Sequence, residues 1–205
     1  MTKRVFVCAW LVLGLGASAA SASSMVVNGG FETGDFSGWA VSVVGVPPCG
    51  PPEVSPNGGT ICGGAYPVAP SHSGNYAAEL TTYNSDAFLD QNLFTEAGGT
   101  YELRFWLSNI AINGQILPNH FNLSWNGAVI FSATDMPAFA YTEYVFSGLV
   151  ASGPLTQLRF GGVRQDPGYF QLDDVTVNAV PEPATLLLLG SGLVGAARRF
   201  RKRAN

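Results

Sequence analysis

One run of the chain places polar and aromatic side chains on a single face of an expected strand. Glu102, Arg104 and Trp106 alternate with apolar residues, so they point away from the buried side. Sugar sites combine aromatic faces with carboxylate, amide or guanidinium groups, and this row has that make-up, with Tyr83 as a further candidate. The row predicts carbohydrate binding, with the alternative that a long proline-rich loop covers Trp106.

No recognisable catalytic motif accompanies this row. His72 and His120 are the only histidines, and neither lies in a zinc-binding or nucleophile motif. Glycoside hydrolysis needs only two carboxylates, but nothing in the sequence singles out a pair among the many acidic residues. The sequence therefore predicts a protein that is not an enzyme, with a secreted glycoside hydrolase as the less favoured alternative.

The elements that must position these groups are short strands. Alternating runs separated by turn residues fill residues 23–179, and we expect strands at 76–82, 88–94, 101–108, 121–125, 128–131, 141–147, 156–161 and 169–177. Asn126-Gly127 between two such runs is a strong hairpin signal. The pattern predicts an all-β jelly-roll sandwich, with Trp39 and Trp125 in its core.

Charge is segregated along the chain. Between residues 23 and 179 the only basic residues are Arg104, Arg159 and Arg164, whereas nearly all the acidic residues lie there. Binding to nucleic acid or to anionic lipid depends on lysine and arginine. The body therefore excludes nucleic acid as a partner and suits neutral ligands, or divalent cations with oxygen ligands.

Residues 1–22 have the three parts of a secretory signal peptide. Lys3 and Arg4 precede an apolar run at 5–15, and small residues at 17–22 suit signal peptidase. The alternative is a buried N-terminal helix.

Residues 180–205 also have three parts in order. Pro181-Glu182-Pro183 comes first, followed by an apolar stretch at 184–197. A basic cluster ends the chain: Arg198, Arg199, Arg201, Lys202 and Arg203. As a helix the stretch spans about 20 Å, against a hydrocarbon core of about 30 Å, and the basic cluster marks the cytoplasmic side. We expect a short transmembrane helix suited to temporary retention, with an ordinary tail anchor as the alternative.

This tail resembles the PEP-CTERM sorting signal of bacterial exosortase substrates. The resemblance implies recognition by an exosortase-type sorting enzyme in the inner membrane and cleavage near Pro181-Glu182-Pro183. It also implies transient insertion into that membrane, followed by delivery to the cell surface or the extracellular polysaccharide matrix.

Residues 47–70 are rich in proline and glycine and lack alternation, which predicts a long surface loop. Cys49 and Cys62 are the only cysteines left after export, and an oxidising compartment favours pairing them. Closing this loop with a disulfide adds about 3 kcal/mol in the chain-entropy model.

The two ends of the body resemble the first and last strands of galactose-binding-like jelly rolls, among them carbohydrate-binding modules. The resemblance rests on the run from Val27-Asn28-Gly29-Gly30-Phe31-Glu32 to Trp39 and on the run 170–177. Asp173 shares its alternation with Val175 and Val177, so it points inward unless a bulge intervenes, and an inward carboxylate needs a partner.

The resemblance implies a structural calcium ion at this place. Its ligands are expected to be Glu32, the carbonyl of Gly30 and Asp173, with a further backbone ligand near Ser73. The alternative is that backbone N–H groups or water satisfy these carboxylates without a metal.

Three functions follow. The first is a non-catalytic surface or matrix protein that binds carbohydrate, with exopolysaccharide as its partner. The second is a structural component of the envelope or biofilm matrix without a small ligand, and the third is a hydrolase.

Overall fold

The computed structural model describes residues 24–45, 50–80, 86–112, 114, 118–164, 168–180 and 191–192. The signal peptide at 1–22, the motif at 181–183, the basic cluster, Cys49, Tyr83 and nearly all of the apolar stretch at 184–197 lie outside the described residues. Among the described residues, no helix is long and apolar enough to cross a bilayer. The transmembrane helix and the Cys49–Cys62 disulfide therefore stay predictions.

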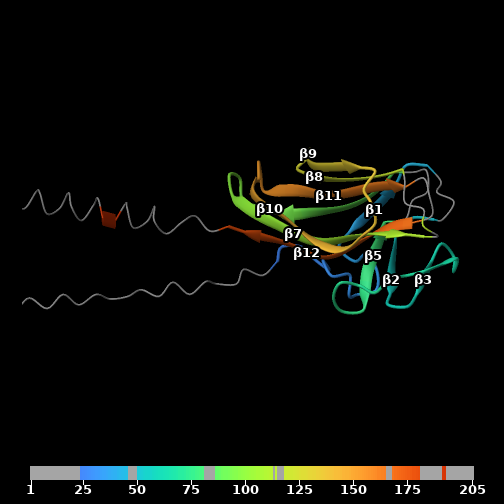
Figure 1. The fold of residues 1–205 in the computed structure, drawn as a ribbon. Helices are drawn as coiled ribbons and strands as arrows, with labels where there is room; N and C mark the ends of the chain where they lie inside the picture. The colour runs from blue at the N-terminus through green and yellow to red at the C-terminus, as the bar shows by residue number, and fades with distance from the viewer. Residues whose placement is uncertain are drawn as a thin grey trace, which may run out of the picture.

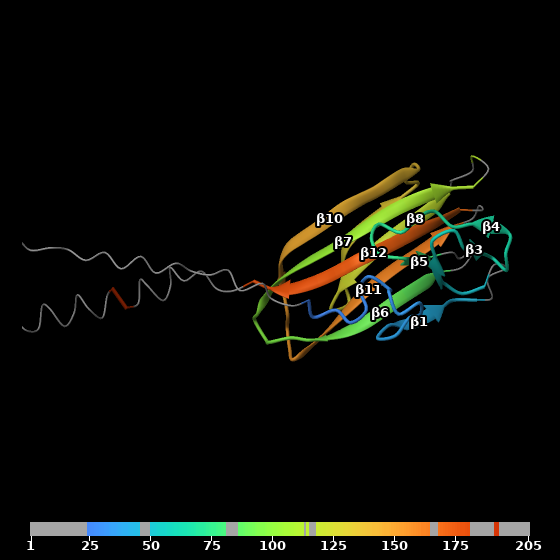
Figure 2. The same ribbon diagram turned by 90° about the horizontal axis from the view of Figure 1, so that it is seen from below.

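The described residues form an all-β sandwich of two antiparallel sheets (Figure 1). Sheet A has the order β1 (Ala40–Val43), β6 (Ala87–Phe94), β11 (Leu155–Arg164), β8 (Asn119–Trp125) and β9 (Ala128–Thr134). Sheet B has the order β10 (Phe139–Val150), β7 (Thr100–Ala111), β12 (Gly168–Ala179), β5 (Tyr76–Leu80) and β2 (Glu53–Pro56). A small hairpin joins β3 (Thr60–Ile61) to β4 (Tyr66–Pro67). Figure 2 shows β10, β7 and β12 side by side.

The core lies between the inner faces of the two sheets, and the alternation of β7 builds one side of it. Leu103, Phe105 and Leu107 are fully buried, as the sequence predicts. Phe105 packs edge-on against Phe160 of sheet A, with ring centroids 5.1 Å apart. The expected core positions of Trp39 and Trp125 are also confirmed, since both side chains are buried.

The predicted hairpin forms at Asn126-Gly127, between β8 and β9. Both residues have positive φ, 51° and 78°. Positive φ at both central positions is the requirement of a two-residue type I′ turn, which explains the choice of asparagine followed by glycine.

The segment 47–70 contains more structure than the expected loop. Its described part carries β2, β3 and β4, and β2 pairs with β5 at the edge of sheet B. Ile61 and Val68 are buried with Tyr169 in a small separate cluster. β2 pairs with β5, and Ile61 and Val68 pack against Tyr169, which is about one hundred residues away in the sequence. Burial by such distant residues produces no alternating pattern within the segment itself.

Asp173 does not point into the apolar core. The register of β12 against β7 shifts between Asp173 and Thr176, and Asp174 has a φ of 50°. This bulge inserts an extra residue, so Val175 keeps its place in the core while Asp173 lies on the outer face of sheet B, opposite Trp106. The inward orientation expected from simple alternation is therefore corrected, although the Asp173 side chain is still fully buried.

Candidate functional site

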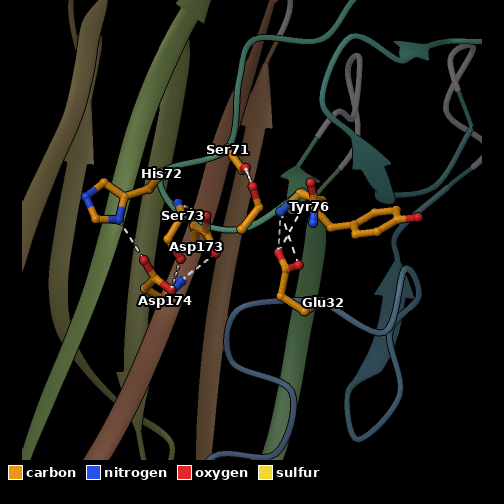
Figure 3. A network of polar contacts seen from close by, with 9 residues as sticks. Glu32, Ser71, His72, Ser73, Tyr76, Asp173 and Asp174 are labelled. Carbon is orange, nitrogen blue, oxygen red and sulfur yellow. Dashed lines mark hydrogen bonds and ion pairs between the residues drawn. The ribbon is translucent and has the colours of Figure 1, made fainter.

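A loop of residues 71–75 lies over the β12 bulge and leads from β4 into β5. Figure 3 shows three carboxylates beneath this 71–75 loop: Glu32 comes from the N-terminal segment, and Asp173 and Asp174 come from the bulge. The 71–75 loop therefore contacts both the N-terminal segment and the last strand of the body. These are the two regions whose sequences resemble jelly rolls.

Glu32 holds the end of the loop next to β5. Its Oε1 accepts hydrogen bonds from the backbone N–H groups of Asn75 at 2.9 Å and Tyr76 at 3.0 Å, and its Oε2 also accepts from Asn75 at 3.1 Å. Gly74 has a φ of 60°, and a Cβ there would lie 2.3 Å from Oε1 of Glu32. Glycine at position 74 is therefore required both by the backbone conformation and by the carboxylate.

Asp173 and Asp174 hold the middle of the loop. Asp173 accepts from the backbone N–H of Ser73 at 3.2 Å and from that of Asp174 at 2.7 Å. Asp174 accepts from the Ser73 hydroxyl at 2.8 Å and pairs with Nδ1 of His72 at 2.6 Å. Burial raises the pKa of Asp173 to about 7, and the neighbouring Asp174 charge acts in the same direction.

His72 covers the indole of Trp106. The two rings are stacked with centroids 3.8 Å apart and an interplanar angle of 14°, and Tyr141 meets His72 edge-on at 5.4 Å. The 71–75 loop therefore covers one face of Trp106. The alternative named in the sequence analysis was a cover by the proline-rich segment 47–70, and the covering residue instead follows directly after that segment.

The residues expected to bind calcium do gather at one place. A Cβ on Gly30 would lie 3.5 Å from Oδ1 of Asp174, 3.8 Å from Cγ of Glu32 and 3.9 Å from Oδ1 of Asp173. Two carboxylates, those of Asp173 and Asp174, thus lie beside Gly30, and each oxygen of these two groups and of Glu32 takes part in a hydrogen bond. Within the described ranges, no group of three or more His, Cys, Asp or Glu side chains is arranged to hold a metal ion.

A buried polar layer continues beside the bulge. Glu79 of β5 is fully buried; its Oε1 accepts from Nε2 of Gln171 at 3.0 Å, and its Oε2 has no hydrogen-bond partner. Gln171 also donates to the carbonyl of Ala69 at 2.9 Å, which ties the layer to the chain before the 71–75 loop. Burial holds the pKa of Glu79 well above its ordinary value, and Asp173 and Glu53 add to this effect.

Farther along β7, the outer face of sheet B is open. Arg104 donates to Glu102 at 2.7 Å and to Glu143 of β10 at 3.1 Å, and its side chain is 43% exposed. Ser147 donates to the second oxygen of Glu102 at 2.7 Å, and together with Arg104 this hydrogen bond lowers the pKa of Glu102. These groups form a fixed polar row that ends at Trp106.

The structure brings Glu102, Arg104 and Trp106 together on one face, as predicted, whereas Tyr83 lies outside the described residues. Sequence reasoning missed His72 and Glu79 because neither belongs to a local pattern. The adjacent pair Asp173-Asp174 was a usable signal, since two consecutive carboxylates cannot both lie on the apolar side of a strand.

Residues 179–202 match the family model of the PEP-CTERM protein-sorting motif. No curated protein matches the sequence. The sandwich is similar to the structure of TmCBM61 in complex with β-1,4-galactotriose, with a TM-score of 0.57 and 15% identity over 78% of this chain and 100% of that one.

Two other similar structures have different roles. The enzymatically active domain of tailspike protein 4 from bacteriophage CBA120 gives a TM-score of 0.54 at 13% identity, over 77% of this chain and 21% of that one. The K1 cleaved adhesin domain of Lys-gingipain from Porphyromonas gingivalis gives 0.53 at 13% identity, over 74% and 96%.

These likenesses establish the fold alone, and the sorting motif indicates export with transient membrane anchoring before processing. The protein is therefore an exported chain with a PEP-CTERM protein-sorting motif at residues 179–202, and its body is a two-sheet antiparallel β-sandwich similar in fold to TmCBM61.

Proposed function

We propose that this protein, once released by an exosortase-type enzyme, acts at the cell surface or in the extracellular matrix and binds polysaccharide without catalysis. The observation that carries the proposal is the open polar row on sheet B, formed by Glu102, Arg104 and Glu143 beside Trp106. The similarity of the sandwich to TmCBM61, a module solved with a galactotriose, adds support.

The row suits sugar hydroxyl groups because its members are already held in place. Arg104 has two carboxylate partners, so its guanidinium is oriented before a ligand arrives. Preorganised groups lose less side-chain entropy on binding. The stacked rings of His72 and Trp106 close one end of the row with an aromatic wall.

Two pockets among the described residues lack the pair of carboxylates that a glycosidase needs. One is lined by residues that include a single carboxylate, Glu96, and another is lined by Tyr66, Tyr169 and apolar neighbours without any acid. Glycoside hydrolysis requires two carboxyl groups facing the bond to be cut, and neither pocket supplies that pair.

The test is a glycan array probed with the released protein, followed by affinity measurement on the best ligand. Arg104→Ala is expected to weaken binding about tenfold or more, since hydrogen bonds to a charged group are lost. Arg159→Ala is the matched control, because Arg159 of sheet A has a similar exposure and an analogous pair with Asp90 at 2.9 Å. Equal binding by both variants would reject the sheet B site, and an array without ligands would favour a structural matrix role.

Calcium at the 71–75 loop is a second proposal, supported by the carboxylates of Asp173 and Asp174 beside Gly30 and by the Glu32 carboxylate on the same loop. Only oxygen ligands are offered by Glu32, Asp173 and the Gly30 carbonyl, which is the chemistry that calcium prefers. A bound cation would also stabilise the charged form of Asp173, whose pKa is raised by burial.

We expect a chelator to lower the melting temperature of the released protein by about 5 °C and added calcium to restore it. Glu32→Gln should remove this response, whereas Glu96→Gln on an exposed loop should keep it. Melting that is indifferent to both chelator and calcium would show that hydrogen bonds alone hold the loop.

A further inference from the structure

Exposed apolar side chains concentrate at the end of the sandwich where β12 stops. Nine large apolar side chains of the described residues are exposed, and four of them lie at this end: Phe94, Val150, Leu155 and Val180. Phe94 is 82% exposed, more than any other in this set. Exposed apolar side chains that gather in one patch, unlike scattered ones, mark an interaction surface.

Strand pairing places these four residues together. Phe94 of β6 and Leu155 of β11 are cross-strand partners at the end of sheet A. Val150 of β10 pairs with Thr100 at the end of sheet B, and the backbone N–H of Val180 donates to the carbonyl of Thr100 at 2.8 Å. The ends of both sheets therefore contribute to one surface, which we name the tail-side end.

The tail-side end also carries little charge. Its connecting loops are residues 95–99, 126–127 and 151–154, and among them Glu96 is the only charged residue. A cavity of about 460 Å³ opens between Phe94, Tyr101 and Val180. Most acidic residues of the body therefore lie elsewhere. Moving this end out of water removes the hydration of few charged groups, so the free-energy cost is small.

The sorting tail leaves the sandwich at the same end. β12 runs toward this end in Figure 1, and Ala179 is its last residue. The apolar stretch of the sequence begins four residues after Val180, at Ala184, and an extended chain of that length reaches at most about 14 Å. While the tail is held in the bilayer, the tail-side end must stay close to the membrane surface.

We propose that the tail-side end is a lipid-contacting surface, which rests on the outer leaflet of the inner membrane until the tail is cut. Phe94, Val150 and Leu155 enter the boundary between headgroups and acyl chains, where aromatic and aliphatic side chains are favoured. The proposal rests on the membrane retention indicated by the sorting motif and does not involve the carbohydrate site.

The test uses the chain without its signal peptide, reconstituted through its tail into phosphatidylcholine vesicles. An environment-sensitive dye is attached to Ala97→Cys in the 95–99 loop, and in a second protein to Val44→Cys, which lies at the opposite end beside Asp86. Spin-labelled lipid is expected to quench the dye at position 97 several-fold more than the dye at position 44. Phe94→Ser with Leu155→Ser should reduce the quenching at 97, whereas Val44→Ser, a 63% exposed control at the opposite end, should not.

Each outcome decides the proposal. Equal quenching at positions 97 and 44 in a protein that floats with the vesicles would overturn the lipid contact and leave membrane retention intact. A dye at 97 that is shielded without lipid would show that the tail or a second copy covers this end instead. Failure of the chain to float would overturn both the contact and the retention, and glycan binding by the released protein would be unaffected.

Discussion

At the scale of single residues, the outer face of sheet B hides two acidic groups of unusual character. Asp173 and Glu79 are both fully buried, and the pKa of each is raised chiefly by burial. Asp173 nevertheless accepts a hydrogen bond from the backbone of Ser73, and Glu79 accepts one from Gln171, which also donates to the carbonyl of Ala69. Burial of these two acids lowers the stability of the fold at high pH. The hydrogen bond to Ser73 helps to position the loop that stacks His72 on Trp106.

Glu79 makes the stability of the fold depend on pH. Its pKa in the folded protein lies well above the ordinary value of 4.5, so the folded state binds the proton more tightly than the unfolded chain. Stability therefore falls as the pH rises from about 4.5 through the raised pKa. We expect Glu79→Gln to be more stable than the wild type at pH 8, with a smaller difference at pH 5, in urea unfolding. The control Glu96→Gln should follow the wild type, and a constant difference across this range would refute the assignment.

At the scale of elements, the bulge of β12 depends on the N-terminal glycines. The backbone N–H of Val175 donates to the carbonyl of Gly29 at 2.9 Å. A Cβ on Gly29 would lie 2.0 Å from the carbonyl oxygen of Val175, a distance that no side chain tolerates. The glycine pair at 29–30 therefore lets the first segment lie directly against the last strand.

Gly29→Ala should destabilise the fold by about 3 kcal/mol, because the backbone of β12 or of the first segment must move. Gly153→Ala is the control, since a Cβ there meets no atom within 4 Å, and it should change the free energy of unfolding by less than about 0.5 kcal/mol. Chemical denaturation of both variants measures the difference. Equal free energies of unfolding for the two variants would show that the backbone near Val175 shifts to admit a Cβ without loss of stability.

The eight strands from β5 to β12 were predictable from short apolar or alternating runs between turn residues, and the alternation is clearest in β6 and β7, where every second side chain is buried over most of the strand. β1 was missed because its four residues are exposed or half-buried at the edge of sheet A, so no alternation marks it. The position of Glu102, Arg104 and Trp106 on one face followed from the same periodicity. His72 could not be assigned, because its place depends on a bulge about one hundred residues away in the sequence.

At the scale of the whole molecule, the chain combines a two-sheet body with a C-terminal sorting motif. The last strand ends one residue before Val180, and the sorting motif covers residues 179–202. We expect the protein recovered from the surface or medium to lack about 20–25 C-terminal residues when the sorting enzyme is present, as the length of the segment after residue 180 requires.

Intact mass spectrometry of the recovered protein, with and without the enzyme, measures this loss. Replacing Pro181-Glu182-Pro183 with alanines should abolish it, and replacing the exposed 126–127 turn by Gly-Gly should leave it unchanged. A tail that stays intact in the presence of the enzyme would recast the protein as a permanently tethered one.

The hydrogen bonds between the first and last segments also set the order in which the body can form. Met25 donates through its backbone N–H to Val177 at 2.8 Å, and β12 lies in the middle of sheet B. A chain that crosses the membrane from its N-terminus has to wait for its final strand before sheet B can close, and contacts this distant in sequence form slowly. We therefore expect folding of the body to finish only after β12 has been translocated, shortly before the predicted membrane segment reaches the bilayer.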